Sequence, residues 1–495
     1  MKTFFKIFII AFIVLTFRVY SDENEPKIRW STDVLVRGGI STMGIDWDED
    51  EVTGYLYALL DSNGIDGDHA EIYRSTDNGQ TWSMWYRNAL INDSSVVSPR
   101  IRVVRDAGDT SWVCVFGIWC EYDENDELWM RAFRADSPSV HFEYNVDNYV
   151  DYYDVEADKG DSAYIYVTYT KNNEIRFSRN NLSGPWQDNI VLFSDPGSDP
   201  SPQVATNSRG DIGVCFVDTS LSPGGRDEIR LFRSKDKGGV WLPVQQVISN
   251  SGYHGISELD MAYSQDASTQ AAWITNTWTV SGDRRVGFCY STDTAATWAY
   301  GDILDGPSSA EQYQSNIRVN RSIGELAVLY TADLGYRRDV AYAHSSDSDP
   351  DSIDVAVAVN DDSLSEFANA PAVVGWTGTN PAVMYVDYGE NNVYFDTLTY
   401  VAGIDEEENV LSVELDYNIL PSKVAIARYS VLQTGLVNIN LINVNGQVVR
   451  RILSSVKTPG TYEINLDYEG LAPGIYILNL ETASGIACRK TILIE

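Results

Sequence analysis

Short apolar runs bounded by turn residues follow one another along most of the chain, and this pattern predicts buried β-strands. One run recurs as an acidic or polar residue, an aliphatic residue, and then alternating positions that often end in Arg-Ser. The first copy spans residues 71–75. Successive aliphatic positions are separated by 56, 47, 54, 57, 54 and 53 residues: Ile72, Leu128, Ile175, Ile229, Val286, Val340 and Val393. This spacing suits a repeated unit of four strands and their loops.

A second apolar run precedes each copy at a similar offset, as in residues 55–60 and 164–169, and a weaker run precedes that one, as in residues 99–104. Seven copies predict an all-β chain built on a seven-bladed β-propeller, with a six-bladed ring and one misread repeat as the alternative. The seventh unit lacks an outer strand. Residues 27–36 form a further strand pattern whose pairing with the seventh unit would close the ring.

Strand signals resume near the C-terminus, after the acidic stretch Asp405-Glu-Glu-Glu408. Residues 436–441 alternate apolar and polar side chains, Asn445-Gly446 is a tight-hairpin signal, and residues 490–495 form a last apolar run. These signals predict a small β-sandwich of antiparallel strands. A propeller is therefore expected over residues 22–401, an acidic linker over 402–415 and the sandwich over 416–495.

The first 21 residues have the pattern of a signal peptide, because Lys2 and Lys6 precede an apolar stretch over residues 7–17 and small residues follow it. That stretch is too short to span a bilayer comfortably, and no second run of spanning length occurs. The sequence predicts a secreted or cell-surface protein without a transmembrane segment in the mature chain. Its formal net charge of −35 disfavours nucleic acid as a partner.

The five cysteines are too few for a disulfide scaffold. Four of them lie within apolar strand patterns, which predicts buried free thiols. A bridge between Cys114 and Cys120 is the alternative.

After the third strand of the first unit the chain reads Ser75-Thr-Asp77-Asn-Gly79-Gln-Thr81-Trp82, the complete Asp-box pattern. Two further copies depart from it at one position each, and their matching residues are Ser234, Asp236, Gly238 and Trp241, and Ser291, Asp293, Thr297 and Trp298. The chain thus resembles the sialidase-like propellers with BNR repeats. The resemblance implies boxes that stiffen hairpins on the face away from the ligand site, through side-chain bonds to backbone N–H groups.

The last 80 residues or so resemble the C-terminal sorting domain of type IX secretion cargo. The resemblance lies in Asn445-Gly-Gln-Val448, Leu471-x-x-Gly474-Ile-Tyr476 and a final strand that begins with Lys490. It departs from the family's usual opening element, since residues 417–421 read Tyr-Asn-Ile-Leu-Pro. A related extracellular sandwich without an export role is the alternative. The resemblance implies bacterial secretion machinery as a partner.

Sialidase catalysis cannot be transferred to this sequence by motif. The family pairs a Tyr nucleophile with Glu and clamps a substrate carboxylate with three Arg, the first in an Arg-Ile-Pro motif that is absent here. By position in the repeat, Arg226, Arg284 and Arg337 lie in equivalent loops and could converge on an anion. The alternative is three separate surface arginines, each paired with a neighbouring Asp.

Other candidates rest on placement alone. Trp119, Tyr122 and Trp278 are candidates for stacking on sugar rings, with packing over the sheet ends as the alternative. Tyr336, Glu311 and His254 are candidates for catalysis. Asp61, Asn63, Asp66 and Asp68 supply the oxygen ligands of a calcium loop but lack its bidentate Glu at the required offset, so a solvated turn is favoured and no cofactor is predicted.

The first functional interpretation is an extracellular propeller that binds carbohydrate or protein through its central face. The alternatives are a glycoside hydrolase of sialidase type and a structural surface protein.

Overall fold

The structure is a computed structural model. It describes residues 28–31, 33–39, 41–64, 67–90, 96–119, 126–158, 164–220, 227–248, 254–265, 270–280, 283–303, 311–320, 323–333, 338–346, 350, 353, 357–359, 372–387, 391–400, 413–415, 419–420, 424–431, 434–443, 447–458, 460–467, 471, 474–482 and 485–493. All of the regular secondary structure in these ranges is β. They contain no helix of the length and apolarity that a membrane crossing requires. Two compact units form, a large one of Trp30–Thr399 and a second that includes Tyr400–Glu495.

The large unit is built from seven antiparallel sheets of the described strands. Six have four strands in chain order: β3 (Ser41–Asp50), β4 (Tyr55–Gly64), β5 (Gly67–Ser75) and β6 (Ser83–Arg87); β7 (Val96–Arg105), β8 (Ser111–Trp119), β9 (Glu127–Arg134) and β10 (Ser137–Asn148); β11 (Tyr153–Ala157), β12 (Ile165–Lys171), β13 (Glu174–Asn180) and β14 (Gln187–Ser194); β15 (Gln203–Thr206), β16 (Ile212–Asp218), β17 (Glu228–Ser234) and β18 (Gln245–Ile248); β19 (His254–Tyr263), β20 (Ala272–Val280), β21 (Asp283–Ser291) and β22 (Ala299–Ile303); β23 (Glu311–Val319), β24 (Glu325–Asp333), β25 (Arg338–Ser346) and β26 (Val357–Ala358).

The seventh sheet joins the two ends of the large unit. It contains β27 (Ala372–Thr377), β28 (Asn380–Asp387) and β29 (Asn392–Tyr400), and β1 (Ile28–Trp30) and β2 (Val34–Gly38) both pair with β29. The register places Val34 opposite Phe395 and Gly38 opposite Asn392. The prediction that an N-terminal segment completes the last sheet is confirmed.

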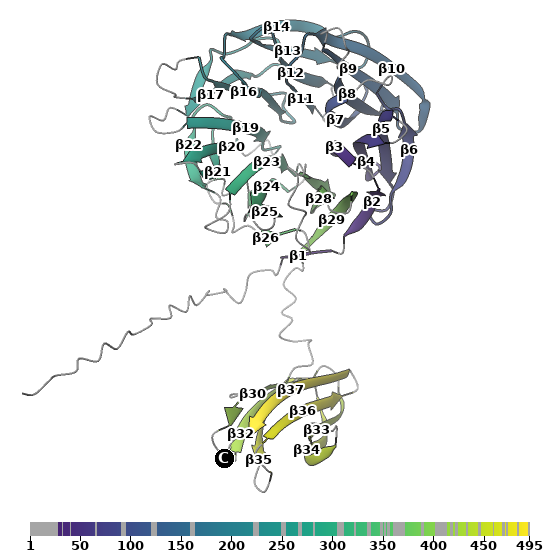
Figure 1. Ribbon diagram of the computed structural model, residues 1–495, viewed down its shortest axis with the longest axis vertical. Helices are drawn as coiled ribbons and strands as arrows, with labels where there is room; N and C mark the ends of the chain where they lie inside the picture. The colour runs from purple at the N-terminus through teal and green to yellow at the C-terminus, as the bar shows by residue number, and fades with distance from the viewer. Residues whose placement is uncertain are drawn as a thin grey trace, which may run out of the picture. The chain divides into compact units, whose positions relative to one another are not determined.

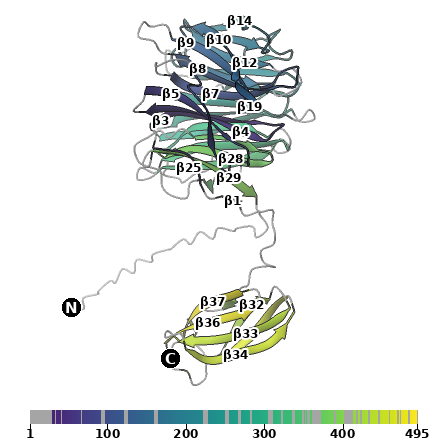
Figure 2. The same ribbon diagram turned by 90° about the vertical axis from the view of Figure 1, so that its right-hand side faces the viewer.

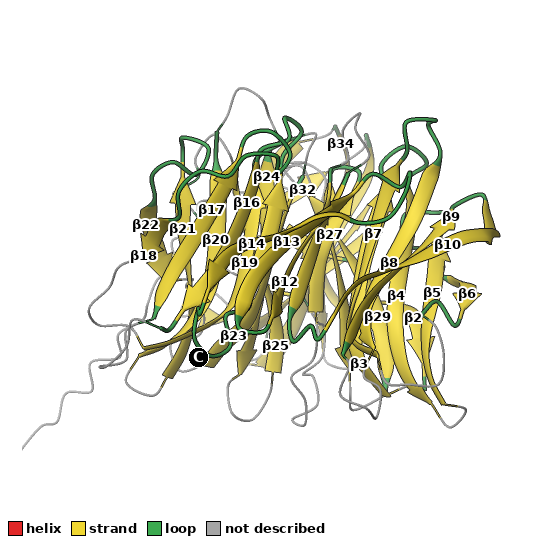
Figure 3. Ribbon diagram, turned by 90° about the horizontal axis from the view of Figure 1, so that it is seen from above, coloured by secondary structure: helices red, strands yellow, loops and turns green. Residues whose placement is uncertain are grey.

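The sheets are arranged around a ring (Figure 1). Their first strands β3, β7, β11, β15, β19, β23 and β27 contact one another in a closed cycle, so they form the inner wall. Figure 2 turns the ring to show its edge, and Figure 3 shows the strands running between two faces. Because each sheet is antiparallel, connections from first to second and from third to fourth strands share one face, which we call the hairpin face. Connections from second to third strands and between sheets share the other, the linking face.

The repeated aliphatic residues occupy matching places in this ring. Each lies in the third strand of its sheet and is at most 1% exposed: Ile72, Leu128, Ile175, Ile229, Val286, Val340 and Val393. The preceding apolar runs are the second strands, buried along most of their length as in β16. Apolar side chains of neighbouring sheets share cores, as where Ile101 packs with Ile72 and Tyr57. The repeat read from the sequence is thus the repeat of the structure.

The second unit has its own core. One sheet contains β30 (Val413–Leu415), β32 (Val424–Val431) and β35 (Gly460–Asp467); the other contains β31 (Ile419–Leu420), β37 (Gly485–Leu493), β36 (Gly474–Thr482), β33 (Gly435–Asn443) and β34 (Val448–Lys457). Tyr429 of the first sheet packs with Ile439 and Leu478 of the second. The pairing is antiparallel except between β31 and β37, which are parallel.

Three thiols are buried and free, at Cys114, Cys215 and Cys289. The alternative of a Cys114–Cys120 bridge is therefore wrong, and the prediction of buried free thiols is confirmed at these three positions. Burial raises the pKa of Cys289 to about 12, which keeps its thiol protonated and unreactive.

Candidate functional site

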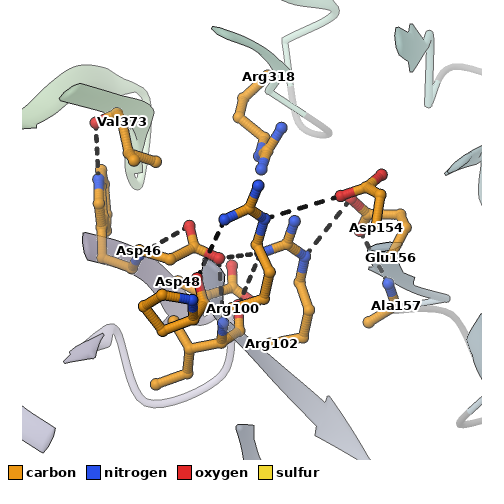
Figure 4. A network of polar contacts seen from close by, with 12 residues as sticks. Asp46, Asp48, Arg100, Arg102, Asp154, Glu156, Ala157, Arg318 and Val373 are labelled. Carbon is orange, nitrogen blue, oxygen red and sulfur yellow. Dashed lines mark hydrogen bonds and ion pairs between the residues drawn. The ribbon is translucent and has the colours of Figure 1, made fainter. Parts of the chain in front are cut away.

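Charged side chains from the inner strands meet around the axis of the ring (Figure 4). The charged residues lie two positions apart in each strand, as Asp46 and Asp48 do, or Arg100 and Arg102. Residues two apart in a β-strand project from the same face, so each pair points the same way. The close-up shows the guanidinium groups of Arg100, Arg102 and Arg318 directed toward a shared space. This space lies among strands that are far apart in the sequence.

Most of the inner strands send a polar side chain to the backbone of the next sheet. The acceptors bind backbone N–H groups as follows: Asp46 with Ile101 at 3.0 Å, Asp48 with Val103 at 2.7 Å, Asp154 with Val204 at 2.9 Å, Asp260 with Ile317 at 2.9 Å and Asn316 with Val374 at 3.0 Å. The inner strands of different sheets do not pair, so these bonds satisfy N–H groups that would otherwise be left without a partner inside the protein. The polar axis thus holds the ring together.

The arginines of the axis are paired with carboxylates. Arg102 is 3% exposed and donates from Nη1 to Asp46 at 2.7 Å, while its Nε lies 3.6 Å from Glu156. Arg318 Nη1 lies 3.3 Å from Asp260. Burial alone would lower the pKa of Arg102, but the carboxylates outweigh it and raise the pKa above its ordinary value. These guanidinium groups therefore stay charged and already have anionic partners.

One axial carboxyl group has a raised pKa. Burial raises the pKa of Asp154 from its ordinary 3.8 to about 6, and repulsion from Asp260 adds to the rise, although Arg100 and Arg102 oppose it. Burial also raises the pKa of Asp260. The negative charges of Asp154 and Asp260 repel each other because the strands that carry them face the same axis.

Asp154 gives the folded protein a specific pH dependence. Because its pKa is higher in the folded than in the unfolded chain, ionisation disfavours folding, and stability should fall as the pH rises from about 4 to about 6. The full effect is about 3 kcal/mol for a shift of about two units. Asp154→Asn keeps an acceptor for the Val204 N–H, and in urea unfolding it should lose this part of the slope. Asp109→Asn, at a site whose side chain is 83% exposed, should retain the slope; an unchanged slope in Asp154→Asn would contradict the assignment.

A cavity of about 380 Å³ occupies the hairpin-face end of the axis. All seven inner strands contribute to it near their C-terminal ends, for example through Trp47, Arg102, Glu156, Thr206, Tyr263, Arg318 and Trp376. Its wall therefore combines aromatic edges with carboxylate, guanidinium, amide and hydroxyl groups. A preformed concave wall that combines apolar surface with fixed polar groups is typical of a small-molecule site.

Close packing and cross-sheet bonds keep the cavity wall rigid. A Cβ on Gly375 would lie 2.6 Å from the Trp47 ring, so only glycine lets this ring pack against β27. At the rim, Asn320 donates to the Gly378 carbonyl at 2.7 Å and Gln265 donates to the Thr206 carbonyl at 2.8 Å. Each of these bonds joins two sheets, and the cavity is therefore preformed.

Three hairpins between third and fourth strands share one hydrogen-bond pattern. In the first, Ser75 Oγ donates to Asp77 at 2.8 Å and accepts from the Gly79 N–H at 2.9 Å, while Asp77 accepts from Thr81. Ser234 with Asp236, and Ser291 with Asp293, repeat the serine–aspartate bond at 2.7 and 2.8 Å. The bond from Thr81 Oγ1 lowers the pKa of Asp77, as expected of a carboxylate that caps a turn. These contacts are local and structural.

A separate polar group lies toward the linking face. Arg284 Nη2 donates to Glu258 at 2.8 Å, and its guanidinium lies 4.6 Å from the centre of the Tyr313 ring. Tyr313 in turn donates to Asp333 at 3.2 Å, and Glu258 accepts from the backbone N–H of Gln314 at 2.7 Å. Glu258 and Gln314 both have positive φ, at bulges in β19 and β23.

The predicted site residues can be placed only in part. Arg284 is ion-paired, Trp278 is buried, Trp119 lies 6.2 Å from the Trp129 ring and Glu311 is exposed. Arg226, Arg337, Tyr122, Tyr336 and Asp66 lie outside the described residues, and of His254, Asn63 and Asp68 only the backbone is described. Asp61 is buried. The described groups of His, Cys, Asp and Glu include none that could hold a metal ion. Convergence of the three predicted arginines stays a prediction.

The arginines that do converge were missed by sequence reasoning. Arg100 and Arg102 lie in the weak strand pattern over residues 99–104, which predicts a strand but no site. The sequence does contain a pattern that could have indicated this site. Pairs of charged residues two positions apart recur in the first strands of three successive sheets: Asp46 with Asp48, Arg100 with Arg102, and Asp154 with Glu156.

Comparison with known proteins supports both units. Residues 421–495 match the family described as "Secretion system C-terminal sorting domain". A search of curated proteins found no match. Among solved structures, an ulvan lyase, which is a polysaccharide lyase, is similar with a TM-score of 0.51 at 10% identity, over 74% of this chain and 95% of its own.

Two arabinan-related enzymes are similar at lower scores. An α-L-arabinanase of Penicillium chrysogenum has a TM-score of 0.45 at 15% identity, over 65% of this chain and 99% of its own. An α-L-arabinofuranosidase of Fusarium graminearum has a TM-score of 0.45 at 11% identity, over 75% of this chain and 98% of its own. The large unit thus has a β-propeller-like fold, and the sorting domain marks the chain as a secreted or cell-surface protein of the type IX system.

Proposed function

We propose that this chain is an exported seven-bladed β-propeller that binds a carbohydrate ligand in the cavity at the hairpin-face end of its axis. The three Asp-box hairpins lie on this same face, whereas the resemblance to sialidase-like propellers implies a ligand site on the opposite face. A signal peptide over residues 1–21 starts its export, and a C-terminal β-sandwich directs it to the surface. The observation that carries the proposal is the cavity itself, at about 380 Å³ and with all seven inner strands in its wall. Such a volume holds about one or two sugar rings.

The chemistry of the wall supports a polyhydroxylated ligand. Carboxylates such as Glu156 and guanidinium groups such as that of Arg318 both line the cavity, so acceptors and donors for hydroxyl groups are present in its wall. Trp47 and Trp376 are at most 7% exposed, with their indole N–H groups bound to backbone carbonyls. Their edges supply apolar contact without moving.

Binding is tested by titrating the full chain with a panel of oligosaccharides, with calorimetry as the readout. Gln265→Ala removes a polar group of the wall and should weaken binding of any responding sugar by about tenfold. Gln245→Ala, on the outer strand β18, removes the same side chain away from the axis and should leave affinity unchanged. Equal affinities for both variants, or no response to any sugar, would contradict the proposal.

A sialidase-type hydrolase is the second candidate. Arg284 favours this candidate, because it is bound to Glu258 and lies over the Tyr313 ring. Arg, Glu and Tyr are residue types that sialidases use in their active sites. Against it, Arg100, Arg102 and Arg318 at the axis already face carboxylates. Turnover of a fluorogenic sialoside by the wild type but not by Arg284→Ala would replace the binding proposal with this one.

A further inference from the structure

The wall of the axial cavity carries more acidic than basic side chains. Four carboxylates and two guanidinium groups line it: Asp48, Glu49, Glu51 and Glu156, with Arg102 and Arg318. Both arginines also have a carboxylate partner behind the wall, Asp46 for Arg102 and Asp260 for Arg318. The charge that a ligand meets is therefore negative.

We propose that the cavity takes a cationic saccharide, one whose ring carries a protonated amine. This inference rests on the proposed function and narrows it to a class of ligand. An ammonium group gives charge-assisted hydrogen bonds to carboxylates, while the neighbouring ring hydroxyls suit the amides and hydroxyl of the wall. The same negative wall repels uronate and sulfated sugars.

Two of the carboxylates are held in place before any ligand arrives (Figure 4). Asp48 accepts the Val103 N–H at 2.7 Å, and Glu156 accepts the Ala157 N–H at 2.9 Å while its other oxygen lies 3.6 Å from Arg102. A fixed carboxylate loses little freedom when it binds a cation. The second oxygen of Asp48 accepts the Glu49 N–H at 3.0 Å, so both of its oxygens are positioned.

Gln265 helps to fix the wall beside these carboxylates. Its Nε2 donates to the carbonyls of Thr206 at 2.8 Å and Tyr263 at 3.2 Å, which fixes the orientation of the amide. Its Oε1 is buried and finds no donor among the described residues. This oxygen is shielded from the cavity, so Gln265 shapes the wall and does not itself accept from a ligand.

The test compares three trisaccharides of one length with the full chain at about pH 6, where a sugar amine is protonated. The probes are the glucosamine trimer, its N-acetylated form and a galacturonic acid trimer. The glucosamine trimer should bind at least about tenfold tighter than the acetylated form, and this advantage should shrink between roughly 50 and 500 mM salt. Asp48→Asn keeps an acceptor for Val103 and should weaken only the glucosamine trimer, by about tenfold.

The control is Asp136→Asn, which removes one charge at a site whose side chain is 66% exposed and should change none of the affinities. If the acetylated or galacturonic acid trimer binds as tightly as the glucosamine trimer, the amine preference is wrong while carbohydrate binding stands. If no trimer binds and an oligolysine peptide does, both the saccharide class and the proposed function are wrong. Thermal unfolding of each variant shows whether the fold is intact, and Glu156→Gln repeats the test at a second carboxylate.

Discussion

Gly79→Ala should destabilise the large unit by about 2–4 kcal/mol, because the new methyl group meets both a strained backbone and a neighbouring sheet. Gly79 has φ of +86°, and a Cβ there would lie 2.0 Å from the Phe395 ring of β29. Gly238 repeats the situation against Phe177 of β13 at 2.5 Å. Urea unfolding followed by tryptophan fluorescence measures the loss.

The third hairpin shows how the chain tolerates a methyl group at this place. There Ala295 has φ of +59° and is completely buried, in the same core as Leu231 of β17. Leu231 occupies in β17 the position that Phe395 occupies in β29. The hairpin that carries Ala295 in place of glycine therefore packs against leucine, which is smaller than phenylalanine. Gly79→Ala combined with Phe395→Leu should therefore recover part of the stability that Gly79→Ala loses. Gly184→Ala, with nothing within 4 Å, is the control; an equal loss there would remove the contact with Phe395 as the cause.

Asp46→Ala should cost about 3–5 kcal/mol, because it leaves the buried guanidinium of Arg102 without its nearest carboxylate. Asp46 also accepts the backbone N–H groups of Ile101 at 3.0 Å and Trp47 at 3.0 Å, which become unsatisfied. Glu156, at 3.6 Å from Arg102, is a weaker partner. The free energy of unfolding from denaturant titration is the measurement.

Removing both charges together distinguishes a buried ion pair from simple loss of packing. Asp46→Ala with Arg102→Leu should be less destabilised than Asp46→Ala alone, because no unpaired charge is then buried. Asp136→Asn, which weakens an exposed pair with Arg134, should change stability by less than about 1 kcal/mol. A double variant as unstable as the sum of its single variants would show that Asp46 and Arg102 act independently.

Much of the ring could be predicted because its strands are buried on both faces. Ile72, Ile229 and Val393 recur with a polar neighbour and a tight turn, which fixes both the period and the strand type. The closure through residues 34–38 was predictable because a seventh sheet lacked a strand. The inner strands are harder to recognise from sequence, since their charged residues at Asp46, Arg102 and Glu156 have the appearance of an exposed surface.

The candidate site was less predictable for the same reason. Closely spaced charged residues are usually expected to be exposed to solvent. Arg102 is nevertheless only 3% exposed, because carboxylates from two other sheets surround it. The contacts that bring them together join residues more than 50 positions apart and leave no trace in local spacing. Trp278, a candidate for sugar stacking, is buried, as the alternative of packing over the sheet ends expects.

The pairing of β2 with β29 sets the order in which the large unit can be completed. Residues near Leu35 pair with residues near Tyr394, so the chain must be present at least from β2 to β29 before this pairing can form. Until the last sheet is available, β29 and the inner strand β3 each lack a neighbour, and an open β-edge invites association with other chains. A protein with this arrangement reaches its sealed state only when its two distant ends are free to find each other.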